Sequence, residues 1–196
     1  MPDPFTVTAF ASSASVPESH FAAAEAFGRG VGERGWTLVY GGNQPGPMGR
    51  MAKAARDAGG RVVGVTPHLF GGDPNSGMSD VIDRDCHELV MVDTMRQRKA
   101  EMERRGHAFV TLPGGIGTLE EFFEILVGRH LRQHDKPVIL LNHDDYYAPL
   151  LEWLRRGTLD GFVRKNVWEQ LHVAESVDAA LRELEIACER AAVSGI

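Results

Sequence analysis

The stretch Thr111-Leu112-Pro113-Gly114-Gly115-Ile116-Gly117-Thr118-Leu119-Glu120-Glu121 organises the predicted fold. The apolar run that leads into it, Ala108 to Leu112, is typical of a buried strand, and Leu119 to Val127 is typical of a helix. Glycine permits a close backbone approach and conformations that other residues avoid. The first N–H groups of a helix lack internal acceptors and lie at the positive end of its dipole. A glycine loop that leads into a helix is therefore a candidate phosphate site.

Two well-known phosphate-binding patterns do not fit this loop. Glu120 stands where the dinucleotide fingerprint has its third glycine, and the Gly-Lys-Ser/Thr of a Walker A loop is missing. Spacing alone leaves two interpretations open, a site for a nucleotide or sugar phosphate and a tight strand-to-helix turn. Thr118 and Glu121 also fit a capping box, with Thr118 as the N-cap and Glu121 reaching back to its amide. A cap and a ligand contact can coexist on one helix end.

Two other stretches carry similar signals. Gly41 to Gly49 is a second glycine-rich loop, and it precedes a helix predicted from Arg50 to Ala58. Ser12 and Ser13 follow the first predicted strand, Phe5 to Phe10. In open parallel sheets, ligands bind at the carboxyl ends of the strands, so these hydroxyl groups are candidate ligand contacts. An ordinary serine-rich turn is the alternative.

Predicted strands and helices alternate along the chain. Further strands are predicted at Trp36 to Tyr40, Gly60 to Pro67, Glu88 to Val92 and Pro137 to Asn142, with a short one within Val167 to Val173. Further helices are predicted after Val16, after Thr94, at Tyr147 to Arg156 and from Ser176 onward. Phe70 to Asp80 is rich in glycine and aspartate and is predicted to be a surface loop that serves as a connection, with a loop that flanks the site as the alternative. This alternation predicts an α/β fold in which helices cover both faces of a parallel sheet.

The loop and a second motif together resemble one known family. Pro113 to Glu121 resembles the PGGxGTxxE signature of the LONELY GUY (LOG) family, which are cytokinin riboside 5′-monophosphate phosphoribohydrolases often mislabelled as lysine decarboxylases. Met95-Arg96-Gln97-Arg98-Lys99 resembles the family's Arg-Lys motif, in which a methionine precedes the pair. The resemblance runs from the first strand to the last helix, and it implies one Rossmann-like domain over residues 1–196. The departures from the family pattern are Ala11 and Asn43 for glycines, Pro47 for leucine, and Gly128 and His130 near the usual tryptophan and glutamine.

The resemblance implies an enzyme that hydrolyses the N-glycosidic bond of cytokinin nucleoside 5′-monophosphates and AMP, releasing the free base and ribose 5-phosphate. It implies that Arg98 and Glu121 are catalytic. The residues implied to bind substrate or its phosphate are Ser13, Gly42, Met95, Lys99, Pro113, Gly114, Gly115, Gly117 and Thr118. Without the family match, the basic run around Arg98 would be interpreted as a solvated helix face. The alternative function is a non-catalytic protein that binds a nucleotide or phosphorylated cofactor, which needs the glycine loop but not both Arg98 and Glu121.

The composition of the chain indicates which classes of partner the protein is expected to bind. The net charge of −6 argues against a protein that binds nucleic acid, because such proteins present a basic face. It does not argue against binding of a nucleotide monomer. The two cysteines have no metal-ligand spacing and the sequence shows no leader, so a cytoplasmic protein is expected. The sequence has no long apolar run, so binding to a membrane is not expected. His130 and His134 lack the glutamate of a zinc motif, so no metal is expected, and the proposed reaction needs no organic cofactor. The family resemblance implies a homodimer, and either a dimer contact or a deep core would explain the adjacent Phe122 and Phe123.

Overall fold

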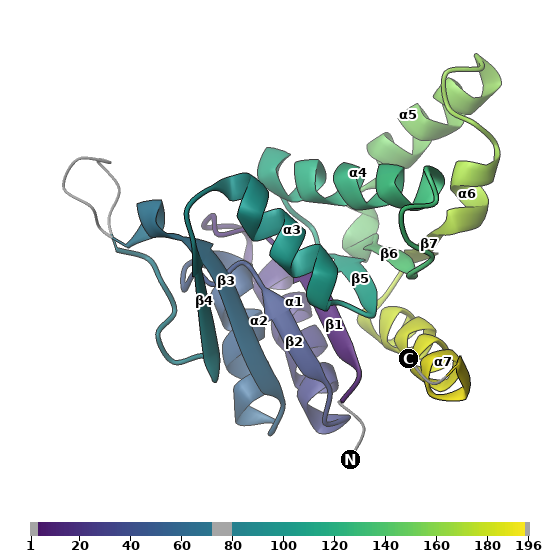
Figure 1. Cartoon of the computed structure of the whole chain (residues 1–196). Helices are drawn as coiled ribbons and strands as arrows, with labels where there is room; N and C mark the ends of the chain where they lie inside the picture. The colour runs from purple at the N-terminus through teal and green to yellow at the C-terminus, as the bar shows by residue number, and fades with distance from the viewer. Residues whose placement is uncertain (1–3, 72–79, 195–196) are drawn as a thin grey trace.

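The strands of the described residues form one seven-stranded sheet in the order β4-β3-β2-β1-β5-β6-β7 (Figure 1). The structure is a computed structural model that describes residues 4–71 and 80–194. Every pair of neighbouring strands is parallel, which confirms the predicted fold class. The strands are β1 (Thr6–Phe10), β2 (Thr37–Tyr40), β3 (Arg61–Pro67), β4 (Glu88–Val92), β5 (Ala108–Thr111), β6 (Val138–Leu141) and β7 (Leu171–Ala174). Most of the connection predicted at Phe70 to Asp80 lies outside the described residues.

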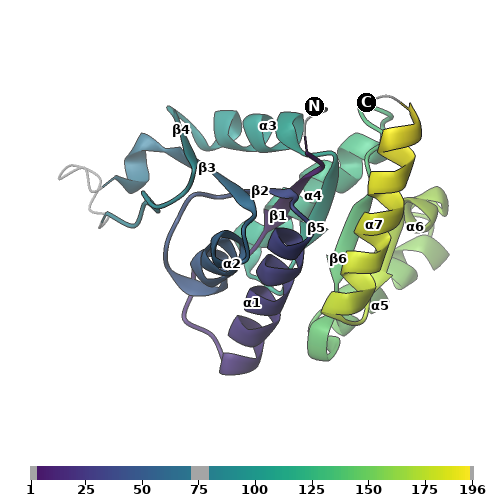
Figure 2. The ribbon, with the colours of Figure 1, turned by 90° about the horizontal axis from the view of Figure 1, so that it is seen from below.

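Helices cover both faces of the sheet, as Figure 2 shows from below. They are α1 (Glu18–Glu33), α2 (Gly46–Asp57), α3 (Met95–Arg105), α4 (Ile116–His130), α5 (Ala148–Leu159), α6 (Asn166–Gln170) and α7 (Val177–Ser194). Side chains of α1, α2 and α7 join one hydrophobic cluster, and those of α3, α4, α5 and α6 join the cluster on the opposite face. None of the helices within the described residues is long and apolar enough to cross a membrane.

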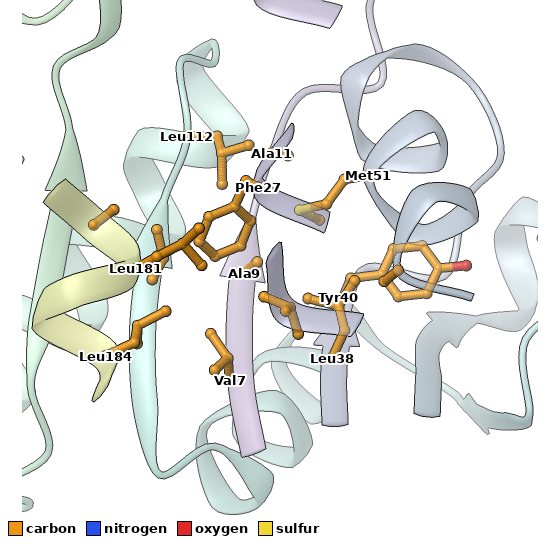
Figure 3. Packing of buried hydrophobic residues seen from close by; sticks show 14 of the residues in the cluster. Val7, Ala9, Ala11, Phe27, Leu38, Tyr40, Met51, Leu112, Leu181 and Leu184 are labelled. Carbon is orange, nitrogen blue, oxygen red and sulfur yellow. The ribbon is translucent and has the colours of Figure 1, made fainter. Parts of the chain in front are cut away.

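The alternation of side chains along the central strand divides the core into these two clusters. Val7 and Ala9 of β1 point toward α1 and α7, and Phe10 belongs to the opposite cluster. Phe27 of α1 is fully buried in the first cluster, close to Leu181 of α7 (Figure 3). Burying a side chain of this size contributes about 1.5–3 kcal/mol, so the sheet and its helices are held together mainly by such contacts.

Two glycines in α1 bring it into direct contact with α2. A Cβ atom placed at Gly28 would lie 2.1 Å from the carbonyl oxygen of Met51, and one at Gly32 would lie 2.5 Å from that of Ala55. The two helices therefore pack backbone against backbone. This contact fixes α2, and with it the glycine-rich loop that precedes α2.

The strand order reverses between β1 and β5. The chain builds the sheet outward from β1 to β4, returns to place β5 on the other side of β1, and continues to β7. The amide of Leu112 donates to the carbonyl of Phe10 at 2.9 Å, so the carboxyl ends of the two central strands lie side by side. Such a switch point is where open α/β sheets bind ligands.

Helix α4 begins earlier than the sequence pattern predicted. Its first residue is Ile116 and its N-cap is Gly115, so Thr118 is the third helical residue. The capping box with Thr118 as the N-cap is therefore wrong, and Glu121 is released for another partner. The glycines of this stretch are typical of a loop, but the first turn of a helix tolerates them. Likewise α2 begins at Gly46 rather than Arg50, and the short strand β7 follows a helix, α6, that the sequence did not predict.

Candidate active site

A cleft of about 230 Å³ opens at the switch point. Its walls come from the end of β1, the loop before α2, the 3-10 turn His68–Phe70, and the first turns of α3 and α4. The lining residues are Ala11, Ser12, Ser13, Asn43, Met48, Phe70, Met95, Arg98, Gly115, Gly117, Thr118, Glu120 and Glu121. Seven of these were predicted as site residues, namely Ser13, Met95, Arg98, Gly115, Gly117, Thr118 and Glu121. The cleft thus brings together groups from both predicted motifs.

The loop before α4 exposes backbone to this cleft. A Cβ atom placed at Gly115 or Gly117 meets no atom of the described residues within 4 Å. Pro113 and Gly114 are buried behind them, and a Cβ atom at Gly114 would lie 2.3 Å from the hydroxyl of Thr118. The N–H groups at the start of α4 lack intrahelical acceptors, so this surface favours an anion.

Two adjacent tyrosines form hydrogen bonds to the backbone of the segment that leads into α4. The hydroxyl of Tyr146 donates to the carbonyl of Gly114 at 2.9 Å, and the hydroxyl of Tyr147 donates to that of Leu112 at 2.8 Å. Burial raises the pKa of Tyr147, so its hydroxyl stays protonated as a donor. The sequence pattern placed Tyr147 at a helix start and gave no sign of this support.

Arg98 and Glu121 form a buried ion pair at the bottom of the cleft. Nη1 of Arg98 lies 2.6 Å from Oε1 of Glu121, and the two residues expose 4% and 6% of their surface. Arg98 also donates from Nε to the carbonyl of Val65 at 3.1 Å. Burial raises the pKa of Glu121, and the charge of Arg98 opposes this rise. A buried carboxylate of this kind is a candidate base with a stated partner.

The start of α3 aims Arg98 into the cleft. Thr94 is the N-cap, and it forms a capping box with Gln97, so the helix entry is fixed. Gly41 leaves the space that the guanidinium occupies, because a Cβ atom there would lie 1.8 Å from Nη2 of Arg98. The second glycine loop therefore takes part in placing the ion pair.

The second glycine loop packs against the turn after β1 that contains Ser12 and Ser13. Gly46 adopts a φ of +71°, and a Cβ atom there would lie 2.4 Å from the backbone of Ser13. The amide of Met48 donates to the carbonyl of Ser12 at 2.9 Å, so protein already occupies this helix amide. Asn43 has an ordinary negative φ rather than a left-handed one, and its Oδ1 accepts from the hydroxyl of Thr66 at 3.2 Å.

Asp83 anchors this loop, although the sequence gave it no role. Its amide donates to the carbonyl of Gly42 at 2.9 Å, which keeps Gly42 buried behind the cleft lining. Its Oδ2 accepts from the hydroxyl of Tyr40 at 2.6 Å and from Arg56 at 2.7 Å. Burial would raise the pKa of Asp83, but these two donors outweigh it and lower the pKa below its ordinary value. The carboxylate stays ionised as a structural acceptor.

Lys99 lies beside the cleft rather than in its lining. Its ammonium group contacts the carboxylates of Glu120 and Glu124, both on α4. Burial lowers the pKa of Lys99, but the two carboxylates outweigh this effect and raise it overall. Lys99 therefore stays charged and holds Glu120, which does line the cleft.

Known proteins are similar to this chain in sequence and in fold. The family model described as "Possible lysine decarboxylase" matches residues 48–184. A cytokinin riboside 5′-monophosphate phosphoribohydrolase of Rhodococcoides fascians is 39% identical over 92% of this chain and 89% of its own length. The chain belongs to the LOG family. The protein of the same name from Mycobacterium tuberculosis is 37% identical over 91% of this chain and 92% of its own length.

Solved structures that share the LOG fold include more distant proteins. The molybdenum cofactor carrier protein of Chlamydomonas reinhardtii superposes with a TM-score of 0.67 at 22% identity, over 94% of this chain and 98% of that chain. At this identity the likeness concerns the fold alone. The carrier therefore supports the Rossmann-like architecture and assigns no ligand.

The positions that depart from the LOG pattern have local explanations. Ala11 is buried at the end of β1 and still lines the cleft beside the two serines. A Cβ atom at Gly128 would lie 3.3 Å from the ring of His134, so this ring fills the space above the glycine. His130 is the last residue of α4, and His134 lies beyond the helix, so the two do not share one helical face.

Proposed function

We propose that this chain hydrolyses the N-glycosidic bond of nucleoside 5′-monophosphates, both AMP and cytokinin nucleotides, to free base and ribose 5-phosphate. The observation that carries this proposal is the buried pair of Arg98 and Glu121, 2.6 Å apart, beside an exposed glycine loop at a helix start. Its relatives across most of the chain are phosphoribohydrolases by name. The name of the family model fits poorly with these relatives, so we do not propose lysine decarboxylation.

The phosphate binds at the start of α4 in this proposal. Gly115 and Gly117 leave their backbone open to a ligand, and Thr118 and Ser13 place hydroxyl groups along the same cleft. Helix amides and the helix dipole favour a dianion there. Three of the predicted residues do not contact the phosphate in this proposal, because they are buried and instead shape the two loops: Pro113, Gly114 and Gly42.

The base lies on the apolar side of the cleft. Met48, Phe70 and Met95 are the lining residues with large apolar side chains, and in this proposal they provide polarisable contacts for the ring. Met95 is the first residue of α3 and keeps 37% of its surface exposed, so it can adjust to a substituent on the base. Both adenine and an N6-substituted adenine are therefore compatible with this wall.

Glu121 and Arg98 act at the sugar. Breaking the bond between C1′ and the base nitrogen leaves positive charge on the ribose, which a nearby carboxylate stabilises. A water molecule attacks C1′ and gives its proton to Glu121, while the bond electrons leave with the base, which takes up a proton from solvent; Glu121 returns its proton to solvent afterwards. Burial raises the pKa of Glu121 and makes it a stronger base, while the charge of Arg98 opposes this rise and its hydrogen bond orients the carboxylate.

Chromatography of the products tests this function directly. The purified protein is incubated with AMP and, separately, with N6-isopentenyladenosine 5′-monophosphate. We expect equimolar free base and ribose 5-phosphate from at least one of them, and the faster substrate identifies the preferred base. Absence of base from both substrates, with nucleotide binding retained, would favour the alternative of a binding protein without turnover. A binding protein needs the glycine loop, but it does not need the buried Arg98–Glu121 pair.

A homodimer is part of the same proposal. Five large apolar side chains near the end of α4, along α5 and just after α5 are half or more exposed, namely Val127, Leu131, Trp153, Leu159 and Phe162. Helix α5 and the segment after it extend beyond the sheet (Figure 1), whereas Phe122 is fully buried in the core. An exposed apolar surface of this kind is typical of a subunit interface. Sedimentation should give a dimer that Trp153→Glu weakens, and a wild-type monomer at micromolar concentration would contradict the proposal.

The cellular location remains a prediction from the sequence. Cys86 and Cys188 are both free thiols in the structure, which suits the reducing cytoplasm.

A further inference from the structure

The cleft contains a second carboxylate whose role differs from that of Glu121. Glu121 exposes 7% of its side chain and is engaged by Arg98, whereas Glu120 exposes 53% of its side chain and lines the cleft. The family motif singles out Glu121 and gives Glu120 no role. We propose that Glu120, positioned by Lys99, binds the ribose hydroxyl groups and makes the enzyme select ribonucleotides over 2′-deoxyribonucleotides. This inference rests on the proposed function.

The position of Glu120 along α4 suits the sugar. It is four residues after Ile116, the first helical residue, so its Cα lies about 6 Å along the helix from the proposed phosphate site. Helical side chains lean toward the N-terminus, which brings this carboxylate back toward the phosphate end. The ribose is attached directly to the 5′-phosphate, so it is the part of the substrate within reach.

The chemistry of a carboxylate also suits the sugar. An ionised carboxylate only accepts hydrogen bonds, and the ribose hydroxyl groups can each donate one. A phosphate offers acceptors of the same charge and would be repelled. Carboxylates that bind ribose hydroxyl groups are a known device of nucleotide-binding sheets.

Lys99 makes a carboxylate tolerable at this position. Its side chain exposes only 14% of its surface, and its ammonium group contacts both Glu120 and Glu124. This contact restricts the rotamers of Glu120 and reduces the repulsion between its carboxylate and a nearby phosphate. Lys99 is thus a positioning residue that acts through Glu120.

The experiment compares kcat/KM for AMP and 2′-deoxy-AMP in the wild type and in variants. We expect Glu120→Ala to lower kcat/KM for AMP by about 10- to 100-fold, the cost of losing hydrogen bonds to a charged group, and to affect 2′-deoxy-AMP much less. The AMP preference therefore falls. Comparing this preference between proteins cancels the different intrinsic reactivity of the two nucleotides. An unchanged preference in Glu120→Ala, with both substrates slowed equally, would overturn the inference.

Two further variants separate selectivity from general damage. Glu124→Gln removes the other carboxylate that contacts Lys99, and Glu124 does not line the cleft, so we expect the AMP preference to be retained. Lys99→Met should lower the preference, but it should have no added effect in the Glu120→Ala background. If the wild type releases no base from either nucleotide, the proposed function is wrong. Calorimetric binding of AMP and 2′-deoxy-AMP to wild type and Glu120→Ala then decides the role of Glu120 separately.

Discussion

The two glycine-rich loops resemble each other in sequence but differ in what their glycines face. Both follow a strand and lead into a helix. Gly114 and Gly115 precede α4, whose first turn contains Gly117, and Gly41 and Gly42 precede α2, whose first turn contains Gly46 and Gly49. Gly115 and Gly117 face open space, whereas a Cβ atom at Gly49 would lie 1.7 Å from the carbonyl oxygen of Gln44. The amide of Met48 in α2 is already bonded to Ser12.

The difference separates a ligand-binding loop from a supporting one. The α4 loop presents backbone to the cleft, and the α2 loop uses its glycines to pack tightly on neighbouring backbone and on Arg98. Arg98 connects the two loops, since it lies against Gly41 and pairs with Glu121 of α4. Substitutions in the two loops should therefore fail in different ways, by losing activity in one and stability in the other.

Arg98→Met should have the largest effect because it removes the connection between the loops. Glu121 would remain buried without its partner, and breaking a buried pair in this way costs about 3–5 kcal/mol. Denaturant unfolding should show this loss, together with a large fall in base release. A loss below about 1 kcal/mol, typical of an exposed pair, would contradict the burial of the pair.

Gly46→Ala should act on stability through the supporting loop. The residue has a φ of +71°, and the new Cβ atom would meet the backbone of Ser13. Strain and overpacking together should lower the free energy of unfolding by about 2–4 kcal/mol. Gly35→Ala is a matched control, because Gly35 has a φ of +66° but no described atom lies within 4 Å of its Cβ position. Equal losses in the two variants would mean that contact with the serine turn is unimportant.

Gly115→Ala should show the opposite behaviour in the ligand-binding loop. The φ of Gly115 is −91° and its Cβ position is open, so alanine fits without a clash. Changing the N-cap from glycine to alanine should cost less than about 1 kcal/mol. The methyl group would displace the phosphate, and we expect kcat/KM to fall roughly 10- to 100-fold. Unfolding and AMP turnover measured on the same preparation would separate the two effects, and unchanged turnover would place the phosphate elsewhere.

Tyr146→Phe should give the smallest effect on the same loop. It removes the hydrogen bond to Gly114, worth about 0.5–1.5 kcal/mol. Tyr147→Phe removes the bond to Leu112, one step further from the cleft. We expect similar losses of stability from both and a clearer rise in KM for AMP from Tyr146→Phe. A larger rise in KM from Tyr147→Phe would reverse their assigned order.

The strands and helices of the fold could be predicted from the sequence because their signals are local. Apolar runs predicted the strands, and the resemblance to the LOG family implied that Arg98 and Glu121 belong to one site. The structure brings these two side chains into contact although they lie 23 residues apart, and their catalytic role stays a prediction. Asp83 and Tyr146 were missed because their partners, Tyr40 and Gly114, are 43 and 32 residues away and no local pattern marks them. The predicted start of α4 is wrong because glycine is typical of loops. The spacing of glycines also does not distinguish a glycine packed against backbone from one that faces open space.

Glu121→Gln tests the central claim most directly. The side chain keeps its size but loses the carboxylate, while the glycine loop is untouched. Base release from AMP and calorimetric binding of AMP are measured on wild type and variant under the same conditions. We predict that release falls on the order of 100-fold or more while AMP binding changes little. Near-normal release by the variant would contradict the assignment of Glu121 and the account of this cleft as an active site.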